Sequence, residues 1–396
     1  MDSTPTSRST TKEFLADYID IILGVIFTIV ALFFHLHHQI FLSVLSAAIA
    51  IGAFSMTVAE IAEILADRLE EPYASFVLTF SAVVVEIVLL FMIIANAHDS
   101  VQGLETVKGG IISAVIVDMN VLLGLAVFIG GISNLGKHKL EQKHNEETSS
   151  TYTTILLVAT SALLVPSVLN YTDSADKLFT TSVVIATLLM VFYIAIFIFQ
   201  TKTHNEFFKY KKNRFSRVNK VEKAIKEGKS IEDIEEHDEN YLFERLPNIA
   251  NFVAIFIFIF IIGILAEIFA SDGMVLAKEY GISTGLAGLI IAIIAVSPEV
   301  VTAIKAAKDD EIQRVINIAM GASTVSIMLT VPILMLLAYA NGINLTLDFN
   351  AFQVGALLLT IILAWKTTDN GETNYFEGVS HLMFFAAYAT IATMYH

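Results

Sequence analysis

FVLTFSAVVVEIVLLFMII, residues 76–94, is a predominantly apolar stretch that carries one carboxylate, Glu86, close to its middle. The stretch LAGLIIAIIAVSPEVV, residues 286–301, carries Glu299 in the opposite half of the chain. Each belongs to an apolar run of about the 20 residues that an α-helix needs to cross a bilayer. A charged side chain at the centre of such a helix costs about 2.5–3.5 kcal/mol on insertion scales, so it is rarely without a role. The two glutamates therefore predict one shared site inside a membrane.

The composition indicates a membrane protein with many spans. Of the 396 residues, 55% are hydrophobic and 16% are charged, and the mean hydropathy is +0.69, which is unlike a soluble domain. The formal net charge of -15 fits either acidic loops or a surface that attracts cations. Nothing in the sequence resembles a nucleic-acid-binding patch, so no nucleic acid partner is expected. The chain has no cysteine, which excludes disulfides and thiolate metal sites.

Familiar motifs of enzymes and ATPases are missing from the sequence. The phosphate-binding motif G-x-x-x-x-G-K-[ST] does not occur, and neither do H-E-x-x-H or G-x-S-x-G. The sequence therefore predicts a protein that is not an enzyme, holds no cofactor and is not driven by ATP.

Eleven apolar segments are predicted to span the bilayer. The first is interpreted as a retained helix, because residues 1–16 are polar and no A-x-A cleavage site follows it. Since eleven is odd, the two termini are expected on opposite sides. The predicted spans are 18–35, 40–66, 73–96, 107–133, 152–170, 176–201, 247–270, 283–308, 312–340, 349–366 and 375–394.

The distribution of basic residues predicts the orientation. Of the 24 Lys and Arg residues, all but Lys108, Lys177 and Lys278 fall in the N-terminal tail and the even-numbered loops. The positive-inside rule then places the N-terminus in the cytoplasm and the C-terminus outside. Short loops and the absence of organelle signals favour a bacterial plasma membrane, where the lipid bilayer is the surrounding partner. A homo-oligomer is compatible with the sequence.

The fold class expected is an all-α membrane protein with 11 transmembrane helices, namely one extra N-terminal helix plus two inverted five-helix repeats. A weak repeat supports this, because residues 82–86 correspond to residues 295–299, each ending in a glutamate. Within the central loop, residues 231–244 are either a solvated linker or an acidic helix that senses cytoplasmic cation. The predicted parts are 1–39 (N-terminal tail and extra helix), 40–201 (first repeat), 202–246 (cytoplasmic loop with the acidic segment) and 247–396 (second repeat).

The central chemistry predicted is competition between a proton and a cation. A buried carboxylate can hold either one, but not both at once. A hard cation such as Ca²⁺ prefers six to eight oxygen ligands, so two glutamates cannot suffice. Pro298 lacks an N–H and is expected to free a backbone carbonyl near Ile294 or Ala295. Further candidate ligands are Asp118, Ser297, Ser323 and Thr324.

Several of these residues allow a second interpretation. Asp118 is either an ion ligand or the structural partner of a neighbouring hydroxyl, and the Ser and Thr residues of its span and of 312–340 also suit helix packing. Glu60 and Glu267 lie near span ends and are either access-route residues or interfacial residues that face water.

The sequence resembles the calcium/cation antiporter superfamily, in particular the calcium/proton exchanger (CAX) branch. Glu86 and Glu299 match the glutamates of the family's two repeat motifs, residues 60–69 look like the acidic end of its second helix, and residues 320–325 look like its small-residue motif. The resemblance covers nearly the whole chain beyond the first span. It implies one extra helix, two inverted repeats and cation binding by both glutamates. From their placement near span ends, Glu60, Glu63 and Glu267 are predicted to lie on the access route.

The chain departs from the family pattern at polar positions. The usual Gly-Asn pair is Ala82-Val83 in the first repeat and Ala295-Val296 in the second, and Val325 replaces a glutamine. The S-P-E sequence ending at Glu299 is closer to a bacterial subgroup associated with calcium/proton and also sodium or potassium/proton exchange. The resemblance therefore supports cation/proton antiport more firmly than calcium selectivity.

The leading hypothesis is a secondary antiporter that exports cytoplasmic Ca²⁺ in exchange for H⁺. The first alternative is a Na⁺ or K⁺/H⁺ antiporter of the same fold, and the second is a cation channel.

Overall fold

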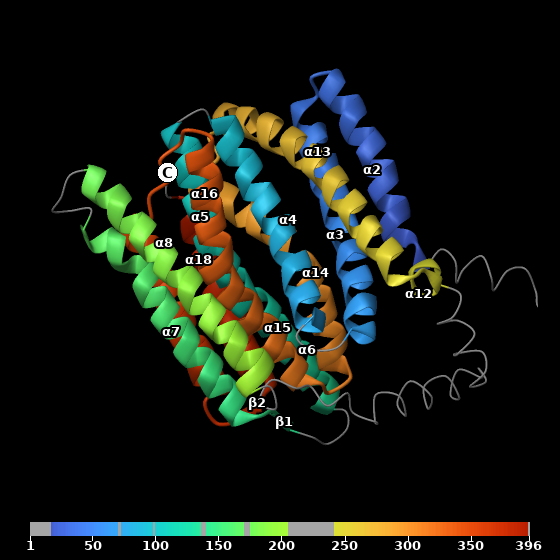
Figure 1. Ribbon diagram of the computed structural model, residues 1–396, viewed down its shortest axis with the longest axis vertical. Coiled ribbons are helices and arrows are strands. Elements are labelled where there is room, and N and C mark those ends of the chain that lie inside the picture. Colours follow the sequence, from blue (N-terminus) through green and yellow to red (C-terminus); the bar gives the residue numbers. More distant parts are fainter. Residues whose placement is uncertain are drawn as a thin grey trace, which may run out of the picture.

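The computed structural model describes residues 17–69, 73–97, 100–135, 140–169, 175–204 and 241–394. These residues form an all-α bundle, with one short strand pair at its edge (Figure 1). The longer helices are α2 (Ile19–Leu36), α3 (Ile40–Arg68), α4 (Tyr73–Ala97), α5 (Val101–Ile116), α6 (Leu123–Leu135), α7 (Glu146–Leu169), α8 (Ala175–Ile198), α13 (Asn248–Tyr280), α14 (Thr284–Lys308), α15 (Ile312–Val325), α16 (Val331–Ala340), α17 (Ala351–Thr368) and α18 (Tyr375–Ala392). The acidic segment predicted at 231–244 lies mostly outside the described residues.

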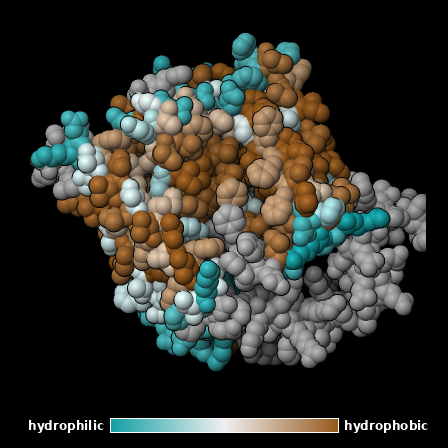
Figure 2. All heavy atoms as spheres, in the orientation of Figure 1, coloured by the Kyte–Doolittle hydropathy of each residue, from teal (hydrophilic) through white to brown (hydrophobic). Residues whose placement is uncertain are grey.

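The helices confirm a membrane protein of many spans. Within the described part of the chain, 10 helices are long and apolar enough to cross a membrane. The last helix, α18, is not one of them, and it contains the polar side chains of Glu377 and His381. The count of eleven spans therefore stays a prediction. Side chains on the face shown in Figure 2 are mainly hydrophobic across the middle and hydrophilic towards the top and bottom, as expected for a protein surrounded by lipid.

The helices near the first predicted span form one side of the bundle. Helix α3 packs against α2 and α13, and α4 packs against both α3 and α13, as the blue and gold ribbons of Figure 1 show. Helix α13 continues to Tyr280, well beyond the predicted span end at 270. At the other end of α13, Arg68 donates to the backbone carbonyl of Leu246 at 2.7 Å. The contact ties the end of α3 to the short helix α12 (Leu242–Arg245).

Two long spans are interrupted by π-helical turns. Segment η1 (Val117–Leu122) separates α5 from α6, and η3 (Ser326–Thr330) separates α15 from α16. These are the fourth and ninth predicted spans, which are equivalent helices of the two proposed repeats. A π-helical turn shifts the faces on which side chains point and is frequent at functional sites. Both interruptions contain polar residues at mid-helix.

A two-residue strand pair joins loops from the two halves. Strand β1 (Gln142–Lys143) pairs antiparallel with β2 (Glu372–Thr373). Lys143 and Glu372 form an ion pair of 2.8 Å. The hydrogen bond from Lys143 holds the pKa of Glu372 below its usual range. Because Lys143 is exposed and Glu372 is partly exposed, this pair is a surface contact of small energetic weight.

Candidate functional site

Glu86 is held by hydroxyl groups from the other half of the chain. The residue lies on α4 with only 7% of its surface exposed. Its Oε2 accepts hydrogen bonds from Ser326 Oγ at 2.8 Å and Thr330 Oγ1 at 3.0 Å. The two hydroxyls are four residues apart on η3 and thus reach the same point. The other oxygen, Oε1, is buried without a hydrogen-bond partner, so only one of the two carboxylate oxygens is anchored.

Glu299 has a different environment. It follows Pro298 on α14, and its Oε2 is buried without a hydrogen-bond partner. The hydroxyl of Ser297 does not turn towards it but donates to the carbonyl of Ile294 at 2.8 Å. That carbonyl is the one that lacks an N–H partner because residue 298 is a proline. The carbonyl of Ile294 thus has the hydroxyl of Ser297 as a hydrogen-bond partner, and a carbonyl freed for a cation near Ile294 or Ala295 stays a prediction.

Asp118 completes a group of three interior acids. It lies in η1 with 1% of its surface exposed, and its Oδ2 accepts a hydrogen bond from Ser323 Oγ at 3.0 Å. Its Oδ1 is buried without a partner, as is the hydroxyl of Thr324. The negative charges of Glu299 and Glu86 both act on Asp118, and that of Glu86 acts on Glu299. The three carboxylates are therefore close enough to interact electrostatically.

The geometry leaves three carboxylates incompletely satisfied. Glu86, Glu299 and Asp118 each keep one buried oxygen without a hydrogen bond. Leaving a buried polar atom unpaired costs about 1–3 kcal/mol, and more for a charged group. A proton on the oxygen, or a cation beside it, removes this cost. Among the described residues, however, no group of three or more His, Cys, Asp or Glu closes around one point as a metal site. The acids are thus neighbours without forming a closed coordination shell.

The predicted access-route residues have other partners. Glu60 is half-buried on α3 and accepts a hydrogen bond from Tyr241 Oη at 3.3 Å. Glu63 forms an ion pair with Arg314. Glu267 is exposed on α13. Glu60 and Glu267, both predicted near span ends, therefore differ in their surroundings, since one is half-buried and the other exposed.

Sequence reasoning missed two polar residues of the interior. Thr330 was not considered, although its spacing of four from Ser326 on a helix places both hydroxyls on one side. His381 is 0% exposed and binds Asn120 of η1 through Nδ1 at 3.0 Å. An ionisable residue within a predicted span was the signal that could have identified it.

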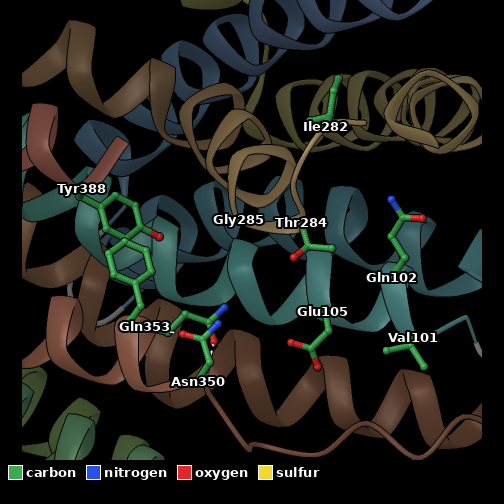
Figure 3. A pocket seen from close by; sticks show the side chains of 10 residues that line it. Val101, Gln102, Glu105, Ile282, Thr284, Gly285, Asn350, Gln353 and Tyr388 are labelled. Carbon is green, nitrogen blue, oxygen red and sulfur yellow. Dashed lines mark hydrogen bonds between the residues drawn. The ribbon is translucent and has the colours of Figure 1, made fainter. Parts of the chain in front are cut away.

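A separate cavity opens between α5, α14, α17 and α18. Its volume is about 480 Å³, and none of the three interior acids is among the residues that line it. Figure 3 shows Glu105 of α5 opposite Asn350 and Gln353 at the start of α17, with Tyr388 at one end. The hydroxyl of Tyr388 hydrogen-bonds Ser113 Oγ at 2.9 Å, which closes this end of the cavity.

Comparison with known families gives the identity of the fold. A family model described as sodium/calcium exchanger protein matches residues 36–202 and 250–394. The chain belongs to this family. The two matched regions fall in the two proposed repeats, and the match confirms the resemblance to the calcium/cation antiporter superfamily. Members of the sodium/calcium exchanger family are transporters, so the protein is an exchanger-family membrane protein and not an enzyme.

Curated relatives extend over most of the chain. The sodium-potassium/proton antiporter ChaA of Escherichia coli (strain K12) is 24% identical over 346 residues, which are 87% of this chain and 87% of that protein. A Ca²⁺/H⁺ antiporter of Synechocystis sp. (strain ATCC 27184 / PCC 6803 / Kazusa) is 24% identical over 297 residues, 74% of this chain and 75% of that protein. The names of these two relatives specify different transported cations.

Solved structures share the fold. The structure of native YfkE matches with a TM-score of 0.74 at 16% identity, covering 95% of this chain and 99% of that one. The crystal structure of the H⁺/Ca²⁺ exchanger CAX matches with a TM-score of 0.68 at 15% identity, covering 97% and 92%. At such identities the likeness establishes the architecture of this exchanger-family chain and nothing finer.

Proposed function

We propose that this exchanger-family protein is a secondary cation/proton antiporter in which Glu86 and Glu299 alternate between H⁺ and a cation. One observation carries the proposal: Glu86, Glu299 and Asp118 each keep a buried oxygen without a hydrogen-bond partner. Such oxygens are stabilised by a proton or by a cation, and the two compete for the same lone pairs. Exchange follows if each ion is released on the opposite side of the membrane.

The anchoring of Glu86 suggests how the two glutamates divide this task. Its Oε2 is fixed by Ser326 and Thr330, which supports a constant position for Oε1. Glu299 Oε2 has no hydrogen-bond partner, so this oxygen is not fixed by the opposite half of the chain. Asp118, Ser323 and Thr324 are proposed to add oxygens when a cation is bound, and Ser297 to stabilise the proline break. Glu60, Glu63 and Glu267 are proposed to lie on the access routes.

The ion proposed is cytoplasmic Ca²⁺, exported in exchange for H⁺ across a bacterial plasma membrane, with the N-terminus in the cytoplasm and the C-terminus outside. The Synechocystis relative is named a Ca²⁺/H⁺ antiporter, which supports this ion. Two facts favour a second candidate, a Na⁺ or K⁺/H⁺ antiporter: the Escherichia coli relative bears that name, and Ala82-Val83 and Ala295-Val296 replace polar Gly-Asn pairs. Fewer oxygens near the glutamates suit a monovalent cation better than Ca²⁺, which needs six to eight.

Everted vesicles test both the mechanism and the ion. Vesicles with a respiration-driven pH gradient are exposed in turn to Ca²⁺, Na⁺ and K⁺, and collapse of the gradient is recorded. The wild type is expected to respond most strongly to Ca²⁺, whereas a stronger response to Na⁺ or K⁺ selects the second candidate. Ion flux without proton movement would instead identify a channel and refute antiport.

Glu86→Gln and Glu299→Gln are each expected to abolish the cation-induced collapse, because an amide neither releases a proton nor balances a cation. The matched control is Glu279→Gln, at an exposed glutamate near the end of α13, which should behave as the wild type. Exchange retained by both Glu86→Gln and Glu299→Gln would refute the proposed mechanism.

A further inference from the structure

Helix α18 crosses α6, the helix that follows η1, at very short range. A Cβ atom placed on Gly378 of α18 would overlap the backbone nitrogen of Phe128 and lie 2.7 Å from the carbonyl oxygen of Gly124, both on α6. A Cβ placed on Gly124 would lie 2.8 Å from Cβ of His381. Small residues at a crossing let two membrane helices touch through their backbones. The crossing therefore presses His381 against the span that contains η1.

His381 is the centre of a buried hydrogen-bond network. Its Nδ1 lies 3.0 Å from Asn120 Oδ1, and its Nε2 lies 3.0 Å from Thr367 Oγ1 on α17. Asn120 in turn donates through Nδ2 to the carbonyl of Ile116 at 3.1 Å and to Thr360 Oγ1 at 3.0 Å. Three spans are joined here through a single imidazole ring.

The partners determine which nitrogen carries the hydrogen. The carbonyl of Ile116 only accepts, so the amide group of Asn120 must present Nδ2 to it and Oδ1 to the ring. His381 Nδ1 is therefore the donor, and Nε2 accepts from the hydroxyl of Thr367. The neutral ring is satisfied at both nitrogens, which suits a fixed support better than a proton carrier.

Asn120 lies two residues after Asp118 within the same π-helical turn. A π-helical turn is less stable than the α-helix that could replace it, so it persists when neighbouring contacts hold it. The bond to His381 is such a contact. If the turn relaxed, Asp118 would rotate away from Ser323, which now donates to it at 3.0 Å.

We infer that His381 is a positioning residue for Asp118, acting through the hydrogen bond from its Nδ1 to Asn120. The inference rests on the proposed function, because it takes Asp118 as a cation ligand. His381 itself does not touch the ion. Loss of the Nδ1 bond weakens cation binding while the proton-coupled exchange cycle remains.

Two amide substitutions separate the two ring nitrogens. In His381→Asn the amide group reaches the place of Nδ1 and can donate to Asn120. In His381→Gln the longer side chain reaches the place of Nε2 and cannot. Full-length variants in liposomes are titrated with whichever of Ca²⁺, Na⁺ and K⁺ gives the largest wild-type exchange. We expect the half-saturating concentration to rise about tenfold in His381→Gln and by no more than about threefold in His381→Asn, as for loss and retention of one buried hydrogen bond.

The matched control is Tyr388→Phe, which removes another buried hydrogen bond of α18, to Ser113 of α5, without touching η1. It should leave the half-saturating concentration within about twofold of the wild type. The reason is that the bond between Tyr388 and Ser113 includes neither Asn120 nor Asp118, and sites without shared partners act independently. Equal half-saturating concentrations in His381→Asn and His381→Gln would overturn the inference, even if both variants unfold at lower temperature. Glu86→Gln and Glu299→Gln are measured in parallel. If both are inactive and the histidine variants are alike, only the inference fails; if both exchange normally, the proposed function fails.

Discussion

Glu86 and Glu299 occupy corresponding positions in the two sequence repeats, but their carboxylates have different hydrogen-bond partners. Glu86 on α4 receives two hydroxyls from η3, whereas the hydroxyl beside Glu299 on α14 is turned to the backbone of Ile294. An approximate sequence repeat therefore does not give two equivalent sites in this protein. One glutamate is anchored by the opposite half of the chain, and the other stands next to a proline break with an unbonded oxygen.

Shortening each glutamate by one methylene should show the largest asymmetry. Glu86→Asp withdraws the carboxylate from Ser326 and Thr330, and a hydrogen bond to a charged group contributes about 1.5–3 kcal/mol. Losing both predicts a fall in exchange rate of at least about 100-fold. Glu299→Asp loses no such bonds, so we expect a fall of about tenfold. The initial exchange rates of the two variants are compared in vesicles that contain equal amounts of protein. Equal losses of rate would contradict the proposed difference between the two glutamates.

Removal of one anchoring hydroxyl should have an intermediate effect. Thr330→Val keeps the side-chain shape but loses the bond to Glu86 Oε2 at 3.0 Å. We expect the half-saturating cation concentration to rise about tenfold, which corresponds to about 1.4 kcal/mol. Cation binding is measured by titration calorimetry on the purified protein. An unchanged half-saturating concentration would mean that the bond from Thr330 to Glu86 does not support cation binding.

The hydroxyl beside Glu299 should matter least. Ser297→Ala removes a bond to the carbonyl of Ile294 at 2.8 Å but none to a carboxylate. A neutral hydrogen bond of this kind contributes about 0.5–1.5 kcal/mol to stability, so thermal unfolding should shift modestly while the half-saturating cation concentration stays within about threefold. A change as large as that of Thr330→Val would show that Ser297 serves Glu299 directly and would remove the contrast between the halves.

Much of the fold was predictable because the bilayer imposes a simple rule on the chain. Spans must be apolar over about 20 residues, and the predicted segments correspond closely to the helices observed. The predicted end of the seventh span at residue 270 falls short of the observed helix, since α13 continues to Tyr280. Hydropathy detects the length of a helix that faces lipid, and a helix can continue beyond that length. The polar ring of His381 within α18 gave no sign of its partner Asn120, which lies 261 residues away in the chain.

The amino-acid sequence was sufficient to predict an all-α membrane protein of an exchanger family, with Glu86, Asp118 and Glu299 near the middle of three spans. The length of the apolar segments and the cost of burying a charge leave few alternative fold classes, and both are evident from short stretches of sequence. Which hydroxyl bonds to which acid depends on the packing of the helices and could not be predicted from the sequence. Ser326 and Thr330 bind Glu86, Ser323 binds Asp118, and Ser297 binds its own helix. The three pairings with acids depend on how helices from the two halves pack and on the π-helical turns that shift their faces. They join residues 205 to 244 positions apart, which is too distant in sequence for a local pattern to reveal.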